Sequence, residues 1–375
     1  MKTKSCGILL PETEIFDSFY GGAIARWVYE IYILSDSIDV TIYGRVKKNS
    51  STTYQGLKIS TKFNFFLSTI RKLPFVRRSL KWIYCLVFYS KIKNSHIIEI
   101  HNEPSYVFIL RKYGYKGIII LHMHNDYFSN YSTTYLNKLS VKLNRLIVCS
   151  KFLKKTIQRS PQLLSKSVVI YNGFDCKKFY QQKLIKSEKL SIGFVGRIDE
   201  NKGLHILLSV YQEIIKTHPE ISLNIVGSSS FGYGGSKYEL SQKLKANEIN
   251  SKYKGAITFH GYMSNHQLVN VYNSIDLLCS FSTKSEAFGM NLVECLACGT
   301  PVLANNIGGV YEAVGYKEML VTDLNIERIA IKVLSIINDK DKTNYLSKIG
   351  KKYVEKKFKW SLLAKKMSYE IFKFF

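Results

Sequence analysis

Short runs of apolar residues alternate with longer amphipathic runs along most of this chain. The short runs are rich in Ile, Val and Leu and predict buried strands, whereas apolar positions spaced three and four residues apart predict helices between them. Strands and helices that alternate at this spacing predict an α/β fold with a parallel, doubly wound sheet. In the first half of the chain the predicted strands are 5–10, 38–43, 96–101, 117–121, 145–149 and 168–170.

The same alternation starts again near residue 190, after a polar, lysine-rich link at 177–189. The sequence therefore predicts two α/β domains, with the boundary between residues 183 and 184. We expect the C-terminal edges of the two sheets to face a common cleft, in which a nucleotide-linked substrate would fit. The predicted strands of the second domain are 191–195, 223–226, 257–260, 275–279, 301–304 and 319–322.

A polar loop follows the strand at 275–279 and leads into a helix predicted over 288–298. Glu286 lies in the loop and Glu294 in the helix, on either side of Gly289. Carboxylates in a loop at the C-terminal end of a strand are typical of a ligand-binding turn in an open α/β sheet. The alternative interpretation is two solvated glutamates beside an ordinary helix start.

The first strand of the second domain ends in Gly196, followed by Arg197 and then by Lys202 at the start of the next helix. The glycine lets the chain turn, and the two cations lie where a helix N-terminus already favours anions. This order predicts a diphosphate site, in which Arg197 and Lys202 stabilise the charge that develops as a bond to the diphosphate breaks.

Two features of the first domain also suggest ligand contacts. The pair Gly21-Gly22 follows the first strand, and its bare backbone N–H groups are able to approach a phosphate or a sugar closely. His122 and His124 follow the strand at 117–121 and point the same way if the strand continues, which would suit a metal pair. Since no third ligand is spaced nearby in the sequence, we favour a site that hydrogen-bonds sugar hydroxyls. His101, at the end of the preceding strand, is expected to support it.

The net charge of the chain predicts a second kind of binding partner. Lys and Arg number 54 against 28 acidic residues, which gives a net charge of +26. Such an excess favours contact with an anionic membrane surface or another polyanion, although a lysine-rich composition alone would also produce it. The segment 68–92 combines basic and aromatic residues as interfacial helices do, and a core helix with a basic first turn explains it equally well.

The cellular compartment is predicted from the lack of a signal peptide and of a membrane-spanning segment in this sequence. The apolar run near the N-terminus is too short for a signal peptide, and no stretch reaches the roughly 18 apolar residues of a spanning helix. Seven cysteines scattered along the chain fit a reducing compartment. We expect a cytoplasmic protein.

Taken together, these motifs resemble those of the retaining glycosyltransferases of family GT4, which have the GT-B fold of two Rossmann-like domains. The resemblance covers nearly the whole chain, and its most specific parts are the Arg/Lys motif and the two glutamates. The matching motifs are Gly21-Gly22, His122-Met-His-Asn125, Cys149-Ser150-Lys-Phe-Leu, Tyr171-Asn-Gly-Phe-Asp175, Gly196-Arg197 with Lys202-Gly203, Gly261, and Glu286 with Glu294.

The resemblance implies transfer of a sugar from a UDP-sugar with retention of anomeric configuration. Arg197 and Lys202 would bind the diphosphate, and Glu294 the ribose hydroxyls. Neither a metal nor another cofactor is implied, because the two cations do the work of a divalent ion. Donor contacts are further implied for Gly21, Gly22, Gly196, Glu286, Phe288, Gly289 and Met290, and a contact near the reacting carbon for His124.

The resemblance also extends the domain assignment, because the C-terminal helix of the family, here 358–375, packs back on the N-terminal, acceptor-binding domain. Residues 184–357 would then form the donor-binding domain. The closest motif likeness is to enzymes of lipopolysaccharide core or surface polysaccharide assembly. We therefore expect a lipid-linked glycan acceptor and a peripheral position at the inner face of the cytoplasmic membrane. No nucleic acid is expected as a partner, because the basic residues follow no nucleic-acid-binding module.

Two other functions remain as alternatives at this point. A nucleotide-sugar epimerase would use the same two-domain architecture, because a fold does not fix a function. A non-catalytic polyanion-binding protein would account for the charge alone.

Overall fold

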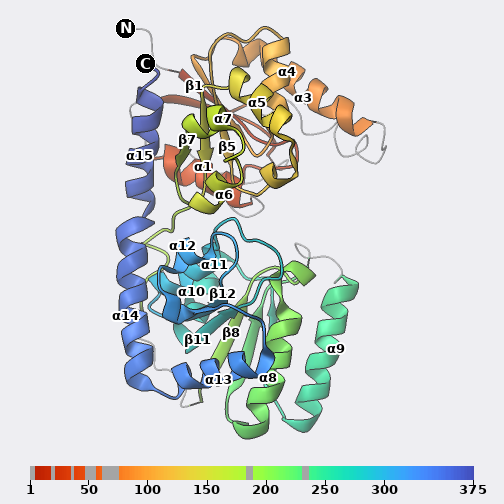
Figure 1. The fold of residues 1–375 in the computed structure, drawn as a ribbon, viewed down its shortest axis with the longest axis vertical. Helices are drawn as coiled ribbons and strands as arrows, with labels where there is room; N and C mark the ends of the chain where they lie inside the picture. The colour runs from red at the N-terminus through yellow and green to blue at the C-terminus, as the bar shows by residue number, and fades with distance from the viewer. Residues whose placement is uncertain are drawn as a thin grey trace. The chain divides into compact units, whose positions relative to one another are not determined.

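A computed structural model describes residues 5–17, 22–34, 38–46, 56–60, 76–182, 189–229 and 236–375. The chain divides into two compact units. Unit 1 comprises Met1–Asn172 together with Trp360–Phe375, and unit 2 comprises Gly173–Lys359. Each unit has its own parallel sheet covered by helices (Figure 1).

Within its described residues, unit 1 has a seven-stranded sheet in the order β3-β2-β1-β4-β5-β6-β7. All neighbouring strands pair in parallel. The strands are β1 (Ser5–Leu9), β2 (Asp39–Tyr43), β3 (Lys58–Ser60), β4 (Ile97–His101), β5 (Ile118–Met123), β6 (Arg145–Val148) and β7 (Ser167–Val169). The helices are α1 (Ala23–Tyr32), α3 (Val76–Ile92), α4 (Pro104–Lys112), η1 (Phe128–Asn130), α5 (Thr133–Lys142), α6 (Lys151–Lys155), α7 (Pro161–Ser165) and α15 (Trp360–Phe372).

The strand order of unit 1 reverses at β1, which pairs with β2 on one side and with β4 on the other. Loops that leave the C-terminal ends of the strands at such a reversal diverge and leave room for a ligand. The segments that follow β1, β4 and β5 therefore lie at the edge of this sheet where a ligand site is expected.

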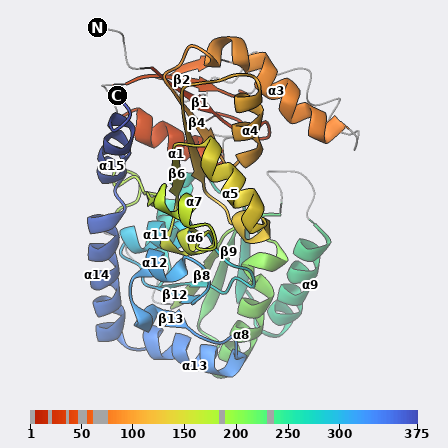
Figure 2. The same cartoon turned by 45° about the horizontal axis from the view of Figure 1, so that its top comes forward.

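The C-terminal helix α15 packs beside α1 against the sheet of unit 1 (Figures 1 and 2). Its inward residues Leu363, Met367 and Ile371 are buried in the same core cluster as Trp27 and Val28 of α1. The last helix of the chain is therefore part of the unit formed by the first half, as the family resemblance implies.

Unit 2 repeats the architecture with six strands in the order β10-β9-β8-β11-β12-β13 among its described residues. The reversal here is at β8, between β9 and β11. The strands are β8 (Ser191–Val195), β9 (Ser222–Val226), β10 (Ile257–Gly261), β11 (Leu277–Ser280), β12 (Val302–Asn305) and β13 (Leu320–Val321). The helices are η2 (Glu200–Lys202), α8 (Leu204–Thr217), α9 (Lys237–Lys252), α10 (Asn265–Ser274), α11 (Met290–Ala297), α12 (Val310–Val314), η3 (Lys317–Met319), α13 (Ile326–Ile337) and α14 (Lys340–Lys357).

Every strand predicted from the sequence is present within a few residues, and β3 is a further short strand that the sequence analysis did not identify. Unit 2 begins at Gly173, ahead of the boundary placed between residues 183 and 184. The reason is that the segment after Gly173 bonds to unit 2: Phe174 forms a β-bridge with Lys359. The side-chain oxygen of Asn273 also accepts from the backbone N–H of Gln182 at 2.7 Å.

The basic and aromatic segment contains α3, which has two different faces. Tyr84, Cys85 and Phe88 are fully buried, while Trp82 and Leu86 are exposed. The helix is thus a core helix that also presents apolar side chains to solvent. Residues 68–75, the first part of this segment, fall outside the described residues. Among the helices described, none has the length and apolar character needed to cross a bilayer.

Two adjacent leucines on α15, one buried and one exposed, allow a test of how much the packing of this helix contributes to the free energy of unfolding. We expect Leu363→Ala to lower the free energy of unfolding by about 2–5 kcal/mol, because it removes a buried side chain and leaves a cavity. Leu362→Ala is the matched control, since Leu362 is 44% exposed against 4% for Leu363, and it should change stability by less than about 0.5 kcal/mol. Urea unfolding followed by circular dichroism measures both, and equal losses would contradict the packing described here.

Candidate active site

The loop after β8 is held against the loop after β9 by a contact between two backbones. The N–H of Gly196 donates to the carbonyl of Val226 at 3.0 Å. A Cβ on Gly227, whose φ is 134°, would lie 1.8 Å from the carbonyl oxygen of Gly196. Since no side chain fits between them, Gly227 fixes the path of the chain that presents Arg197. The Arg197 side chain is largely exposed, and its Nη2 lies 3.4 Å from Oδ2 of Asp199.

A second glycine brings the β8 loop against the end of β11. Gly203 has φ 67° at the end of η2, and a Cβ there would lie 1.8 Å from the carbonyl oxygen of Phe281. This contact places Lys202 beside Glu286, and the ammonium Nζ donates to carboxylate oxygen Oε1. Ser282 donates to the same oxygen at 2.9 Å. The two motifs that the sequence suggested are therefore joined by an ion pair.

A pair of glycines that the sequence analysis did not identify packs against the backbone of the loop that carries Glu286. The N–H of Gly309 donates to the Glu286 carbonyl at 2.7 Å. A Cβ on Gly308 would lie 2.2 Å from that carbonyl oxygen. The signal was present in the sequence, because a Gly-Gly pair after strand β12 repeats the pattern of Gly21-Gly22 after β1.

Glu294 lies about one turn into α11, because the helix begins at Met290 and not at Phe288 as predicted. Gly289, with φ 108°, ends the loop and explains the later start. The Glu294 carboxylate is 6% exposed, and its Oε2 accepts from the Tyr272 hydroxyl at 3.3 Å. Burial, and then the Glu294 carboxylate, raise the pKa of Tyr272 well above its usual value, so the tyrosine remains a donor.

Most of the predicted donor residues of unit 2 line one cavity of about 300 Å³. Cations and carboxylates both reach it, from the loop after β8 and from the loop and helix after β11. The Phe288 side chain is not among its lining residues, and packs instead against Phe358 with ring centroids 5.1 Å apart. The predicted residues in the lining are Gly196, Arg197, Lys202, Glu286, Gly289, Met290 and Glu294.

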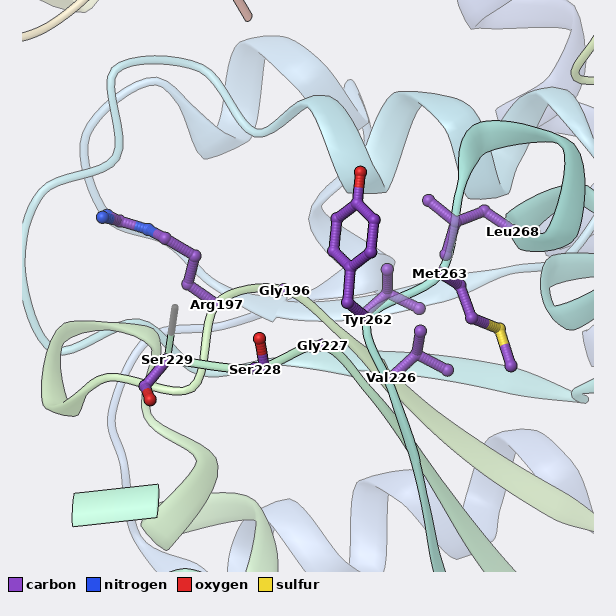
Figure 3. A pocket seen from close by; sticks show the side chains of 10 residues that line it. Gly196, Arg197, Val226, Gly227, Ser228, Ser229, Tyr262, Met263 and Leu268 are labelled. Carbon is purple, nitrogen blue, oxygen red and sulfur yellow. The ribbon is translucent and has the colours of Figure 1, made fainter. Parts of the chain in front are cut away.

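A second, more apolar cavity of about 240 Å³ shares Val195, Gly196, Arg197 and Leu268 with the first. The Tyr262 ring stands above Gly196 and Gly227 in Figure 3, between Arg197 on one side and Leu268 on the other. A flat aromatic wall, apolar neighbours and exposed backbone form a pocket suited to a planar ring. Sequence analysis missed Tyr262 because it lies in a loop with no motif of its own.

In unit 1 the structure groups three histidines at the C-terminal edge of the sheet. His101 pairs with His122 in the parallel register of β4 and β5, and His124 follows the end of β5. The His122 and His124 rings stack with centroids 4.1 Å apart, as expected from their spacing. Asn102 positions the last of them, because its Oδ1 accepts from the His124 N–H at 2.6 Å while its own backbone adopts φ 53°.

The sequence argument that no third metal ligand lies near these residues is wrong. Nitrogens of His101, His122 and His124 all lie within 4.8 Å of one another, because adjacent parallel strands bring together residues that are distant in the sequence. The orientation of the rings nevertheless suits hydrogen bonding better than coordination. The His122 and His124 planes are 14° apart and stacked, so their in-plane lone pairs run side by side and do not converge on one ion.

A buried carboxylate lies below the histidines. Nδ1 of His122 is 3.2 Å from Oε1 of Glu99, and the hydroxyl of Tyr32 donates to Oε2. Burial of Glu99 opposes its ionisation, but His101 and then His122 outweigh this and lower its pKa to about 2. Burial lowers the pKa of His122 to about 4 and that of His124 well below its usual value. His122 and His124 are therefore neutral near pH 7.

The N-terminus of α1, where the sequence suggested a phosphate contact, is capped from within the chain. The N–H groups of Gly22 and Ala25 donate to Oε1 of Glu14 at 2.9 and 3.1 Å. Burial raises the pKa of Glu14 although these bonds oppose the shift. A phosphate at Gly22 would therefore have to displace the Glu14 carboxylate. Gly21 falls outside the described residues.

The family model for group 1 glycosyl transferases matches residues 176–353. Spore coat protein SA of Bacillus subtilis is 25% identical over 74% of this chain and 79% of its own length. The lipopolysaccharide 1,2-N-acetylglucosaminetransferase of Salmonella typhimurium is 26% identical over 86% of this chain and 84% of its own.

Two solved structures share the fold over nearly the whole chain. Anabaena HepE in complex with UDP-glucose has a TM-score of 0.75 at 17% identity and covers 98% of this chain and 99% of its own. Sucrose-phosphate synthase of Thermosynechococcus elongatus has a TM-score of 0.76 at 18% identity and covers 98% of each chain. The matched model shows that residues 176–353 form a group 1 glycosyl transferase domain, so the protein is a glycosyltransferase. The two Rossmann-like units and the likeness to these structures show the GT-B fold.

Proposed function

We propose that this enzyme transfers a hexose or an N-acetylhexosamine from a UDP-sugar to a lipid-linked cell-surface glycan, with retention of the anomeric configuration. The observation that carries the proposal is the cavity of unit 2, where Arg197 and Lys202 face a common space with Glu286 and Glu294. Cations suit a diphosphate, and carboxylates suit the hydroxyls of ribose and sugar. HepE, which shares the fold and whose structure contains UDP-glucose, supports this type of donor.

The ion pair between Lys202 and Glu286 links donor binding to the chemistry. A diphosphate competes with Glu286 for the Lys202 ammonium, and the carboxylate that is released is then available to a sugar hydroxyl. As the bond between the anomeric carbon and the diphosphate breaks, its electron pair moves to a phosphate oxygen near Arg197 and Lys202. The acceptor oxygen then attacks the cation-like sugar from the face that the diphosphate leaves, and the proton of the acceptor hydroxyl passes to the departed phosphate oxygen. Two cations supply the charge stabilisation, so the proposal includes no metal.

The two cavities suit the remaining parts of the donor. Glu294 lines the polar cavity, and its buried carboxylate is held by Tyr272, so it is placed to accept from two neighbouring hydroxyls such as those of ribose. The apolar cavity beneath Tyr262 suits the base, because aromatic and aliphatic walls stabilise a planar ring and backbone groups recognise its edge.

Two observations support the proposed acceptor, namely the named function of one relative and the exposed side chains of α3. The Salmonella typhimurium relative is named as a lipopolysaccharide N-acetylglucosaminetransferase. Trp82, Ile83 and Leu86 are exposed side by side on α3, and the Lys112 ammonium lies 4.9 Å from the centre of the Trp82 ring. Apolar side chains beside a cation, in a chain of net charge +26, fit an anionic membrane surface that presents a lipid-linked acceptor.

Replacing Lys202 tests the diphosphate assignment. Lys202→Ala should weaken UDP binding by about tenfold or more, since it removes a charge-assisted contact and leaves Glu286 facing the diphosphate. The double variant Lys202→Ala/Glu286→Gln should recover part of the loss, because it also removes that repulsion. Lys216→Ala is the control, as Lys216 is an exposed lysine of the same unit paired with Glu213. Isothermal titration calorimetry measures the affinities, and wild-type affinity in Lys202→Ala would refute the assignment.

A second variant separates ribose contacts from phosphate contacts. Glu294→Gln should weaken the binding of UDP by roughly tenfold, the cost of losing a hydrogen bond to a charged group, and should leave the binding of inorganic pyrophosphate unchanged. Both affinities are measured by calorimetry on folded protein, with circular dichroism as the check on folding. Equal weakening of UDP and pyrophosphate would show that Glu294 acts through the diphosphate and not through the ribose.

The membrane assignment predicts a defect from one exposed leucine. Leu86→Glu should reduce sedimentation with vesicles that contain anionic phosphatidylglycerol, because it places a negative charge at the membrane contact. Leu240→Glu is the matched control, since Leu240 on α9 is 54% exposed against 57% for Leu86. UDP binding should remain unchanged in both variants. Identical vesicle binding by the two variants would contradict the proposal that α3 contacts the membrane.

A further inference from the structure

Arg197 lies between two residues whose backbones are hydrogen-bonded to the segment after β9. The N–H of Gly196 donates to the carbonyl of Val226 at 3.0 Å. The N–H of Ile198 donates to the carbonyl of Ser228 at 3.2 Å. The Arg197 side chain itself is 68% exposed, so little of it is packed. The position of the guanidinium therefore depends chiefly on the backbone, and through it on the segment after β9.

A buried carboxylate of α9 binds the end of this segment. Oε2 of Glu239 accepts from the backbone N–H of Ser229 at 2.8 Å, and Oε1 lies 2.8 Å from the ammonium of Lys243. Glu239 is only 4% exposed, and a carboxylate is rarely buried unless it is paired. Burial opposes its ionisation, but the hydrogen bonds from Lys243 and Ser229 outweigh burial and hold the pKa of Glu239 below its usual value. The N–H of Ser229 therefore donates to an ionised acceptor, which is the stronger kind of hydrogen bond.

The first turn of α9, which carries Glu239, is itself bonded to its surroundings. Oγ of Ser236 accepts from the N–H of Glu239 at 3.1 Å and so caps the helix. The N–H of Ser236 donates in turn to Oγ of Ser229 at 2.8 Å. The Tyr238 hydroxyl accepts from the N–H of His205, on the first turn of α8, at 3.2 Å. Glu239 thus lies on a turn that is fixed to two other segments of unit 2.

The contact with Ser229 lies at one end of the apolar cavity. Figure 3 shows Ser228 and Ser229 on the side of the cavity that carries Arg197, whereas Met263 and Leu268 lie on the opposite side. A displacement of Ser229 would therefore disturb the Arg197 end of the cavity first. The far end, which suits the base of the donor, would keep its own contacts.

We propose that Glu239 is a positioning residue for the diphosphate contact of Arg197. By accepting from the N–H of Ser229, it fixes the segment to which both neighbours of Arg197 are bonded. The identity of the ligand rests on the proposed function, whereas the positioning rests on contacts within unit 2. Without the Glu239 oxygen the segment after β9 is released and the guanidinium moves with it. A guanidinium binds phosphate through a fixed fork of donors, so a small displacement lowers the affinity.

Three substitutions of Glu239 in the full-length protein separate its hydrogen bond from its charge. Glu239→Ala removes the acceptor and should weaken the binding of UDP and of inorganic pyrophosphate by about 3- to 10-fold, the usual effect of one hydrogen bond. Glu239→Asp keeps the charge but is one methylene shorter, so it should lose as much. Glu239→Gln keeps an oxygen at the same reach and should retain most of the affinity. Glu248→Ala is the matched control, because Glu248 is an exposed glutamate of the same helix.

Calorimetry measures UDP and pyrophosphate, and ligand-observed NMR measures uridine, which should bind equally well to all variants. Wild-type affinity for UDP in Glu239→Ala would overturn the proposal. Weakening of uridine to the same extent as UDP would also overturn it, because it would show a general defect of unit 2. The reverse order, with Glu239→Asp active and Glu239→Gln weakened, would show that only the charge beside Lys243 matters. If Glu239→Ala fails to fold, the comparison of Glu239→Asp with Glu239→Gln decides between these outcomes.

A double-mutant cycle with Arg197→Ala shows whether Glu239 acts through Arg197. If it does, Glu239→Ala should weaken UDP binding in the wild-type background and change it by less than about twofold when Arg197→Ala is already present. Effects of coupled residues are not additive, whereas those of independent residues are. Additive losses in the double variant would overturn the proposal, because a purely structural role of Glu239 does not depend on the Arg197 side chain.

Hydrogen exchange without any ligand separates failure of this proposal from failure of the proposed function. The N–H of Ile198 donates to Ser228, so the peptide that contains Ile198 should exchange faster in Glu239→Ala than in the wild type or in Glu248→Ala, as measured by mass spectrometry. Faster exchange in a protein whose wild type does not bind UDP would refute the donor assignment alone. UDP binding by the wild type, with exchange at Ile198 unchanged in Glu239→Ala, would refute the role of Glu239 alone.

Discussion

The parallel pairing of β8 with β9 on one side and β11 on the other is the constraint on which the proposed donor site depends. This strand order makes the loops after β8 and β11 leave the same edge of the sheet from neighbouring strands. Lys202 arrives on one loop and Glu286 on the other, and their ion pair joins the two across the edge. Unit 1 repeats the constraint at β1, and its neighbours β4 and β5 carry the histidines.

Glycine is the means by which these loops approach each other. At Gly203 and Gly227 any side chain would meet a backbone carbonyl at 1.8 Å, so the loops are held by close contact between main chains. Gly308 does the same behind Glu286. The residues expected to touch the donor are therefore positioned by residues that carry no functional group, which is why a substitution at these glycines would disturb the site without touching a ligand.

The sequence allowed most of the fold and much of the candidate site to be predicted, because both depend on local patterns. Strands were recognisable as runs of β-branched and aliphatic residues, and Arg197, Lys202, Glu286 and Glu294 as charged residues in the loop and helix segments that follow strands. Tyr262 was not recognisable, since its place beside Gly196 depends on the pairing of β9 with β10. Glu14 was missed because it accepts from the N-terminus of α1 although it lies eight residues before Gly22, outside the spacing of a capping motif.

The sequence by itself determined the α/β class, the two-unit organisation and the motifs of a glycosyltransferase, because hydrophobic periodicity and short motifs are properties of neighbouring residues. Only the tertiary structure decided which charges meet. It paired Lys202 with Glu286, placed His101 against His124, and assigned the segment after Gly173 to unit 2. These contacts join residues that are many positions apart, and strand order and register, which no local pattern encodes, bring them together.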